Sequence, residues 1–315
     1  MPSYNKRTLA KQAQEFGFIR DTFEKMLRLA EMLNYISGDP LLSKLLALKG
    51  GTAINLIIFV LPRLSVDIDF DYSLNSSKDE MIKDREEITK VIRRYMASED
   101  YELSGKSKTT HSLDSFICSY TNSGGTRDAI KIEVNYSLRC HVLPFVSIPI
   151  ETLGLFSETV VLSVAPIEIF AGKINALLNR TAARDLYDMN NMVKFNLFDE
   201  SESSLLRKCV LFYLTISSDE VSNTFDIDRI YGLSNHIIRT DLRPVLRKKD
   251  SFDLLSAQKD VADYLTRLLI INDNEHRYLE AFKNGEYKPE LLFDDVEIQE
   301  RIRNHPMALW KIQNR

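Results

Sequence analysis

The stretch that decides the fold is residues 48–72, which read LKGGTAINLIIFVLPRLSVDIDFDY. It begins with a glycine pair, continues through an apolar run that ends at Pro62, and closes on residues 65–72, where apolar and acidic positions alternate. An alternation with a period of two predicts a β-strand that carries its acidic residues on one face. We therefore predict a turn, a helix over residues 53–60 and a strand over residues 65–72, in that order.

Asp67 and Asp69 stand two positions apart on this strand, so their carboxylates share one face. Two like charges so close together repel each other, and a divalent cation relieves the repulsion. Carboxylate oxygens suit Mg²⁺, or Mn²⁺ in its place, bound together with triphosphate oxygens. An Asp-x-Asp pair is more often a solvated strand face, but here it follows Thr52 by fifteen residues. We predict a metal site at Asp67 and Asp69. Asp71 lies one step further along the same strand face, where it would at most support the metal ligands without binding the metal.

The turn Lys49-Gly50-Gly51-Thr52 is suited to bind the phosphates of a nucleoside triphosphate (NTP). Glycine lets the backbone approach a phosphate, the helix start offers free N–H groups, and the Thr52 hydroxyl can donate a hydrogen bond. A Gly-Gly-Thr by itself is usually only a turn. The sequence contains neither Gly-x-x-x-x-Gly-Lys-[Ser/Thr] nor Gly-x-Gly-x-x-Gly, so it has no P-loop and no dinucleotide-binding fingerprint.

The composition is that of an ordinary globular chain. It has 315 residues, of which 44% are hydrophobic and 27% charged, and 41 basic residues against 45 acidic residues give a net charge of −4. This balance argues against the coating of long nucleic acids but leaves room for a local basic groove. The apolar runs are shorter than the ~20 residues that span a bilayer. No signal-peptide pattern or cysteine–metal spacing is present, so we expect a cytoplasmic chain that binds no membrane.

The remaining patterns place the secondary structure. Before residue 164 we predict helices over 19–34 and 78–96 and strands over 116–120, 130–137 and 158–164. After Pro166 helical patterns dominate, first as an apolar stripe from Ile167 to Leu178 and then at about 202–216, 257–272, 274–285 and 295–304. The change predicts two domains, 1–164 and 165–315. The expected fold class is α+β, a mixed sheet with flanking helices followed by a mostly α-helical bundle, with the active site in the cleft between them.

The first helix after Pro166 carries a second polar group. At about 100° per residue, one stripe of a continuous helix comprises Lys173, Arg180, Arg184 and Asp188. Such a stripe can hold a triphosphate beside a metal site and offset developing charge. We favour Asp188 over Asp185 as the partner of Lys173, provided that residues 181–183 do not break the helix. The alternative is a set of surface ion pairs with no function.

Four ordered motifs resemble the AbiEii toxin group of the nucleotidyltransferase superfamily, and they span nearly the whole chain. They are LKGGTA at 48–53 followed by RLSVDIDF at 63–70, AGKINAL at 171–177 with Arg180, RDLYD at 184–188, and His305-Pro306 with Trp310-Lys311. In this pattern Arg63 and Ser65 precede the acidic strand. Arg63 either contacts phosphate or neutralises the strand, and Ser65 shapes the loop.

The resemblance implies a nucleotidyltransferase fold and metal-dependent transfer of a nucleoside monophosphate from an NTP to an acceptor. In better-understood relatives the acceptor is the 3′ end of tRNA, and the toxin is encoded beside an antitoxin, as in phage defence. The resemblance also implies that Glu133, on the polar face of the strand at 130–137, is the base for the acceptor hydroxyl. The expected catalytic set is Asp67, Asp69, Glu133, Lys173 and Asp188.

A basic segment at residues 229–249 offers a surface for RNA, because it holds six basic residues against Asp241 alone. The RNA-binding candidates are Arg239, Arg243, Arg247, Lys248 and Lys249. A solvated helix end is the alternative. Two other functions stay open, namely the same chemistry on a protein or small-molecule hydroxyl, and NTP binding without catalysis. The sequence does not fix the oligomeric state and is compatible with a monomer.

Overall fold

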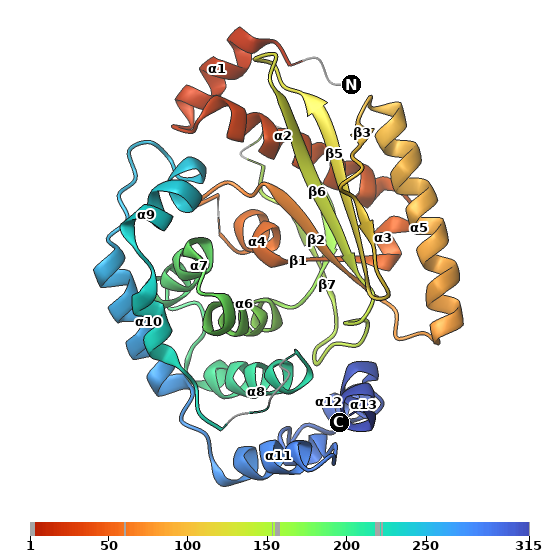
Figure 1. The fold of residues 1–315 in the computed structure, drawn as a ribbon, viewed down its shortest axis with the longest axis vertical. Coiled ribbons are helices and arrows are strands. Elements are labelled where there is room, and N and C mark those ends of the chain that lie inside the picture. The colour runs from red at the N-terminus through yellow and green to blue at the C-terminus, as the bar shows by residue number, and fades with distance from the viewer. Residues whose placement is uncertain are drawn as a thin grey trace. The chain divides into compact units, whose positions relative to one another are not determined.

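A computed structural model describes residues 4–59, 61–152, 154, 158–217, 221 and 223–314. The chain divides into two compact units (Figure 1). The sheet unit comprises Met1–Arg139, Phe145–Val164 and Pro244–Asp250. The helical unit comprises Cys140–Pro144, Ala165–Arg243 and Ser251–Arg315. Each unit thus contains one short segment that lies, in sequence, within the span of the other.

The sheet unit is built on one mixed sheet of eight strands within the described part of the chain. The strand order is β3-β5-β6-β2-β1-β8-β7, and β4 pairs with β5. The strands are β1 Leu46–Lys49, β2 Asp67–Tyr72, β3 Glu102–Leu103, β4 Lys108–Thr109, β5 Leu113–Thr121, β6 Arg127–Asn135, β7 Val146–Pro149 and β8 Val160–Ser163. In the centre, β2 runs parallel to β6 and antiparallel to β1. The predicted mixed sheet is confirmed.

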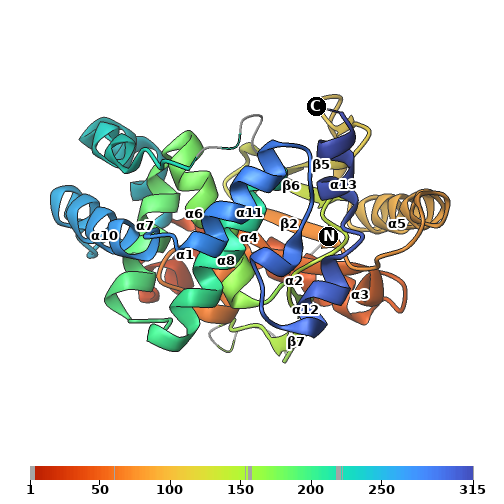
Figure 2. The ribbon, with the colours of Figure 1, turned by 90° about the horizontal axis from the view of Figure 1, so that it is seen from below.

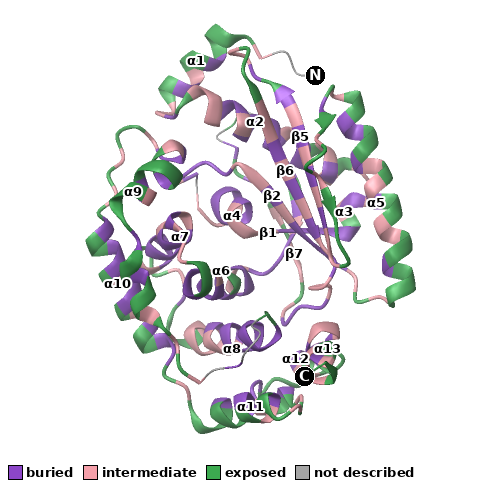
Figure 3. Ribbon diagram, in the orientation of Figure 1, coloured by how far each residue is buried: buried purple, intermediate pink, exposed green. Residues whose placement is uncertain are grey.

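The two faces of the central strands differ in burial, as the alternating colours of β2 and β6 show (Figure 3). Ile68 on β2 and Ile132 on β6 are at most 1% exposed. Ile132 lines a small apolar space together with side chains of helices α2 (Arg20–Gly38) and α5 (Lys78–Ser98), so these helices cover the apolar face. Side chains alternate along a strand, and the acidic residues of β2 therefore point to the opposite face.

The remaining helices of the sheet unit include the one that follows the glycine turn. They are α1 Lys6–Glu15, α3 Leu42–Leu45 and α4 Gly50–Ala53, which continues as the π-helix η1 Ile54–Ile58. The predicted helix over 53–60 therefore begins earlier, at Gly50 itself. Helix α5 begins with a capping box, in which Ser77 and Glu80 bind each other's backbone N–H.

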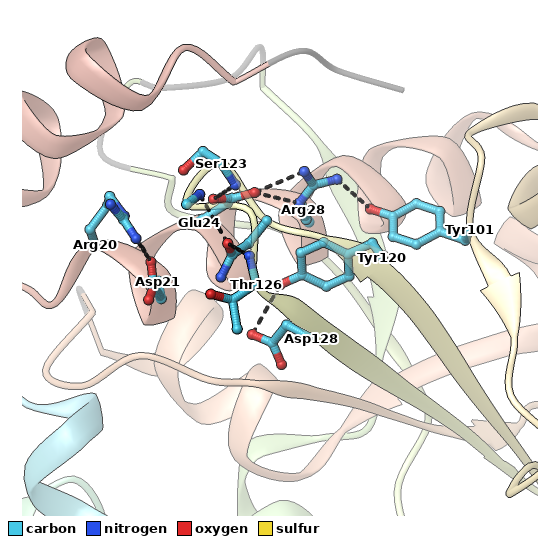
Figure 4. Close-up of polar contacts among 11 residues, drawn as sticks. Arg20, Asp21, Glu24, Arg28, Tyr101, Tyr120, Ser123, Thr126 and Asp128 are labelled. Carbon is cyan, nitrogen blue, oxygen red and sulfur yellow. Dashed lines mark hydrogen bonds and ion pairs between the residues drawn. The ribbon is translucent and has the colours of Figure 1, made fainter.

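A buried ion pair on α2 anchors the turn between β5 and β6 (Figure 4). Glu24 accepts hydrogen bonds from Arg28 at 2.8 Å and from the backbone N–H of Ser123 at 2.8 Å. The Arg28 guanidinium lies over the Tyr120 ring, 4.2 Å from its centroid. The charges of Glu24 and Arg28 neutralise each other, because an unpaired charge buried away from water would be strongly destabilising. The hydrogen bond from Ser123 to Glu24 holds the turn that precedes β6, the strand that carries Glu133.

The α-helices described in the helical unit are α6 Pro166–Arg180, α7 Ala183–Lys194, α8 Glu200–Ser217, α9 Asn235–Ile237, α10 Leu254–Leu268, α11 Asp273–Lys283, α12 Val296–Ile302 and α13 Pro306–Gln313. Helix α6 packs against α7 and α8 (Figure 2). The prediction that helices dominate after Pro166 is confirmed. Among the described residues, no helix combines the length and the apolar character needed to cross a membrane.

Glu168 on α6 explains why residues 140–144 belong to the helical unit. This carboxylate is 3% exposed and accepts the backbone N–H groups of Val142 and Leu143 at 2.8 and 2.9 Å. It also accepts the hydroxyl of Tyr213 on α8. A buried carboxylate needs such donors, and here they come from the passing chain and from a neighbouring helix.

Candidate active site

Three carboxylates come together on neighbouring strands of the sheet unit. In the parallel pairing of β2 with β6, Asp67 lies opposite Lys131 and Asp69 lies opposite Glu133. These side chains share the half-buried face of the sheet, which we call the acidic face and define by Asp67, Asp69 and Glu133. The sequence placed all three acids on polar strand faces, and the strand register brings them side by side.

The electrostatics of the acidic face are those of a crowded set of negative charges. Burial raises the pKa of Asp69, and repulsion by Glu133 and Asp67 adds to this, against the attraction of Lys49 and Lys131. Such repulsion is what a divalent cation relieves. Mg²⁺ commonly binds one or two carboxylates and completes its shell with water and substrate phosphates. The donor set therefore fits Mg²⁺.

No complete metal site of three or more His, Cys, Asp or Glu side chains is preformed within the described ranges. A cation at Asp67 and Asp69 would therefore take its remaining oxygens from substrate or water.

Gly50 is needed beside the acidic face for two reasons. Its φ is +68°, in the left-handed region that side chains disfavour. In addition, a Cβ atom at Gly50 would lie 2.6 Å from Oδ2 of Asp69. The first glycine of the turn therefore leaves the space that the Asp69 carboxylate occupies.

The substitution Gly50→Ala is expected to lower nucleotide transfer at least about tenfold, because it displaces the Asp69 carboxylate and small displacements of reacting groups are costly. The left-handed φ should also destabilise the fold by about 1–2 kcal/mol. Thermal unfolding and transfer from a labelled NTP measure the two effects. Gly105→Ala is the matched control, since a Cβ there meets nothing within 4 Å. Wild-type transfer by Gly50→Ala would show that this contact has no catalytic value.

Other residues of the turn are engaged inside the protein. The Thr52 hydroxyl donates to the backbone carbonyl of Asp67 and lies 2.7 Å from the Ser65 hydroxyl. Thr52 is fully buried, and Arg63 is 2% exposed. The Nη2 atom of Arg63 lies 2.8 Å from the position that a Cβ atom would take if Gly51 had one. The contacts of Thr52 fasten the turn to the start of β2, so the Thr52 hydroxyl is engaged inside the protein rather than open to a phosphate.

Lys49 and Asp71 form an ion pair next to the acidic face. The Lys49 ammonium lies 2.5 Å from Oδ1 of Asp71, whose side chain is 2% exposed. Lys49 is also the cross-strand neighbour of Asp69. Asp71 thus holds the ammonium of Lys49, in agreement with the supporting place predicted for it.

The predicted continuous helix from Lys173 to Asp188 is wrong. Helix α6 ends at Arg180 because Thr181 adopts a left-handed conformation, with φ 51° and ψ 60°, and α7 begins at Ala183. The single stripe with Arg184 therefore does not form, and Arg184 lies half-buried on α7, beyond the break.

The break folds α7 back so that both aspartates reach Lys173. The Lys173 ammonium lies 2.9 Å from Oδ1 of Asp185 and 3.2 Å from Oδ2 of Asp188. Asp185 also binds Nε of Arg180 at 2.8 Å. Burial raises the pKa of Asp185, but Lys173 and Arg180 outweigh it and hold this pKa below its usual value. The condition on which Asp188 was favoured over Asp185 fails, because the helix breaks, and Lys173 contacts both aspartates.

The basic segment is divided between the two units. Arg239 and Arg243 belong to the helical unit and are exposed, whereas Lys248 and Lys249 are exposed in the sheet unit. Arg247 is half-buried, with its guanidinium 5.0 Å from the centroid of the Phe18 ring. Its cation stabilises local packing, so Arg247 is the least accessible of the five RNA-binding candidates.

Sequence reasoning missed Lys131, whose ammonium lies 3.0 Å from Oε2 of Glu133. The available signal was its position two residues before Glu133 on the same strand, which places both side chains on one face.

Comparison with known proteins bears on the family and the fold of the chain. A family profile described as "Nucleotidyl transferase AbiEii toxin, Type IV TA system" matches residues 35–300. The fold is similar to that of MenT4, a nucleotidyltransferase toxin from Mycobacterium tuberculosis H37Rv, with a TM-score of 0.64, 16% identity, and coverage of 98% of this chain and 99% of that chain. A putative nucleotidyltransferase from H. pylori gives a TM-score of 0.46 at 16% identity, over 81% of this chain and 95% of that chain. No curated protein matches the sequence.

Proposed function

The chain belongs to the AbiEii family of nucleotidyltransferase toxins of type IV toxin–antitoxin systems, and on this basis we propose that it transfers a nucleoside monophosphate from an NTP to RNA, with the 3′ end of tRNA as acceptor. The observation that carries the proposal is the acidic face, where Asp67, Asp69 and Glu133 stand on paired strands behind the turn at Gly50. A cognate antitoxin is the proposed protein partner.

The proposed reaction is an in-line attack on the α-phosphorus of the NTP. The acceptor hydroxyl oxygen forms a bond to this phosphorus, the bond to the bridging oxygen breaks, and pyrophosphate leaves with the electron pair. Glu133 accepts the proton of the hydroxyl. Asp67 and Asp69 would hold Mg²⁺, which when bound supplies positive charge to the triphosphate oxygens. The backbone N–H groups of the turn at Gly50 and Gly51 are the proposed contacts of the phosphates.

In the helical unit we propose Lys173 as a phosphate-binding residue. Its ammonium contacts Asp185 at 2.9 Å and Asp188 at 3.2 Å, and two such partners restrict its position. Arg180 shares Asp185 and is 65% exposed, so its guanidinium has room to contact an anion. Arg184 is a further candidate for the same role.

The test is transfer of label from each of the four α-labelled NTPs, in the presence of Mg²⁺, total RNA and cell lysate. The proposal predicts label in RNA of tRNA size, and loss of this label when Mg²⁺ is chelated. Label confined to protein or to small molecules would show that RNA is not the acceptor. Tight NTP binding with label in no acceptor would support the non-catalytic alternative. Arrest of growth on expression is a simple companion measurement.

The double substitution Lys248→Ala/Lys249→Ala is expected to weaken tRNA binding and to make it less salt-dependent. Both lysines are exposed, and each lost phosphate contact lowers the slope of log affinity against log salt by about 0.7–1. Fluorescence anisotropy with labelled tRNA at several salt concentrations measures this slope. The control pair is Lys106→Ala/Lys108→Ala, which is also exposed in the sheet unit. An unchanged slope would remove both lysines from the RNA-binding surface.

A further inference from the structure

We propose that the Lys131 ammonium forms an ion pair with the Glu133 carboxylate in the absence of a divalent cation. When the cation binds, Lys131 is released from Glu133 and binds a substrate phosphate. The inference rests on the proposed function of the acidic face. It adds a residue that neither the sequence motifs nor the family match assigns. Lys131 is thus both a competitor of the cation and a phosphate-binding residue.

The geometry places Lys131 within the acidic face. It is the neighbour of Asp67 in the pairing of β6 with β2, and its ammonium lies 3.0 Å from Oε2 of Glu133. Burial lowers the pKa of Lys131, but the hydrogen bond to Glu133 and the charges of Asp67 and Asp69 raise it overall. Lys131 is therefore a cation at neutral pH, and it stands among the carboxylates proposed to hold another cation.

Lys131 is free to leave this position, in contrast to Lys49. The side chains of Lys131 and Glu133 are 37% and 26% exposed, and an ion pair so exposed is worth only about 0.2–1 kcal/mol. Lys49 instead binds Asp71, whose side chain is 2% exposed. Breaking that pair would leave a buried carboxylate without its partner, which is costly. Of the two lysines, Lys131 is the one that can exchange partners.

Charge balance gives the direction of the exchange. A divalent cation at Asp67 and Asp69 repels a nearby ammonium and reduces the negative potential that holds it on Glu133. The released ammonium stays within side-chain reach of the same sheet face, where a triphosphate brings new negative charge. An exposed lysine on a flexible stem binds phosphate well as a point charge. The same release leaves the Glu133 carboxylate able to accept a proton.

The test measures cation binding apart from catalysis, with Mn²⁺ alone and electron paramagnetic resonance of the free ion. Lys131→Met should bind Mn²⁺ about two- to fivefold more tightly than the wild type, because the competing ion pair is gone. With Mg²⁺ saturating, the same variant should bind non-hydrolysable analogues of the four NTPs, each tested in turn, about tenfold more weakly. Lys131→Arg keeps the charge and should restore NTP-analogue binding. Lys108→Met, at an exposed lysine of β4, is the matched control.

The outcomes separate this inference from the proposed function. If Asp69→Asn loses the Mn²⁺ binding of the wild type, the cation site stands, and Mn²⁺ binding by Lys131→Met that is no tighter than in the wild type would overturn the role of Lys131. If Asp69→Asn binds Mn²⁺ as the wild type does, the cation site itself fails and the inference fails with it. Tighter Mn²⁺ binding together with weaker NTP-analogue binding supports the exchange.

Discussion

Asp69→Asn is expected to lower transfer of the nucleoside monophosphate by about 10³-fold or more, an effect of about 4 kcal/mol on the activation free energy. Asp69 lies opposite Glu133 on β6 and beside Lys49 on β1, in the middle of the charged side chains of the sheet. An amide has almost the same shape as a carboxylate but carries no charge. It therefore cannot balance the charge of a metal ion, and the triphosphate loses its positive counter-charge.

The same substitution should not destabilise the protein at neutral pH. Burial and the neighbouring acids raise the pKa of Asp69, so ionised Asp69 costs folding free energy above that raised value. This cost fades as the pH falls through the folded pKa toward the unfolded one. Asn carries no such cost, so the variant should be at least as stable as the wild type at pH 7.5, and its advantage should shrink at a lower pH chosen below the folded pKa of Asp69.

Urea unfolding at the two pH values and the transfer assay together test this prediction. Asp79→Asn serves as the control because Asp79 is exposed on α5 and is not part of the acidic face, so transfer should continue in that variant. An Asp69→Asn protein that is inactive and also several kcal/mol less stable would attribute the lost activity to misfolding. A stable variant with wild-type transfer would disprove the assignment of the metal-binding acids.

Strong local patterns made much of the fold predictable. The alternation at residues 65–72 gave β2, and the apolar stripe after Pro166 gave α6. Short elements escaped prediction because their structure depends on partners far away in sequence. Strand β1 has only four residues and is defined by its pairing with β2 and β8. Helix α1 buries only Leu9 and Ala13, so it shows no apolar stripe to recognise.

The candidate site was likewise predictable only in part. Asp67, Asp69 and Glu133 could be placed on polar strand faces because strand periodicity fixes the face on which each carboxylate lies, whereas the role of Glu133 came from the family resemblance. Their mutual placement required the parallel register of β2 with β6, which no local pattern encodes.

Asp188 was predicted as a partner of Lys173 and does contact it. The further contact with Asp185 depends on the break at Thr181, and nothing in the sequence around Thr181 marks a left-handed residue. A non-glycine residue takes this conformation only when its surroundings stabilise it.

Lys173→Met is expected to destabilise the helical unit by about 3–5 kcal/mol, because removal of one partner of a buried ion pair leaves the other uncompensated. The side chains of Asp185 and Asp188 are 2% and 0% exposed, and both contact the Lys173 ammonium. Asp185 retains Arg180, which is itself 65% exposed and a weak substitute. Asp188 loses its contact with the Lys173 ammonium at 3.2 Å.

A double-mutant cycle tests this reasoning by urea unfolding. Lys173→Met/Asp188→Asn should recover part of the stability lost in Lys173→Met, because the uncompensated charge is removed as well. Lys194→Met, at an exposed lysine of α7, is the control and should unfold like the wild type.

The lowered pKa of Asp185 determines how the free energy of unfolding depends on pH. Ionised Asp185 stabilises the folded protein above the unfolded pKa, and this stabilisation is lost as the pH falls through the folded pKa. Because Lys173 is a main cause of the lowered pKa, the wild type should lose more stability in acid than Lys173→Met. If the double variant regains stability but not transfer, the pair of Lys173 and Asp188 serves the reaction as well as the fold, whereas recovery of both would confine this pair to the fold.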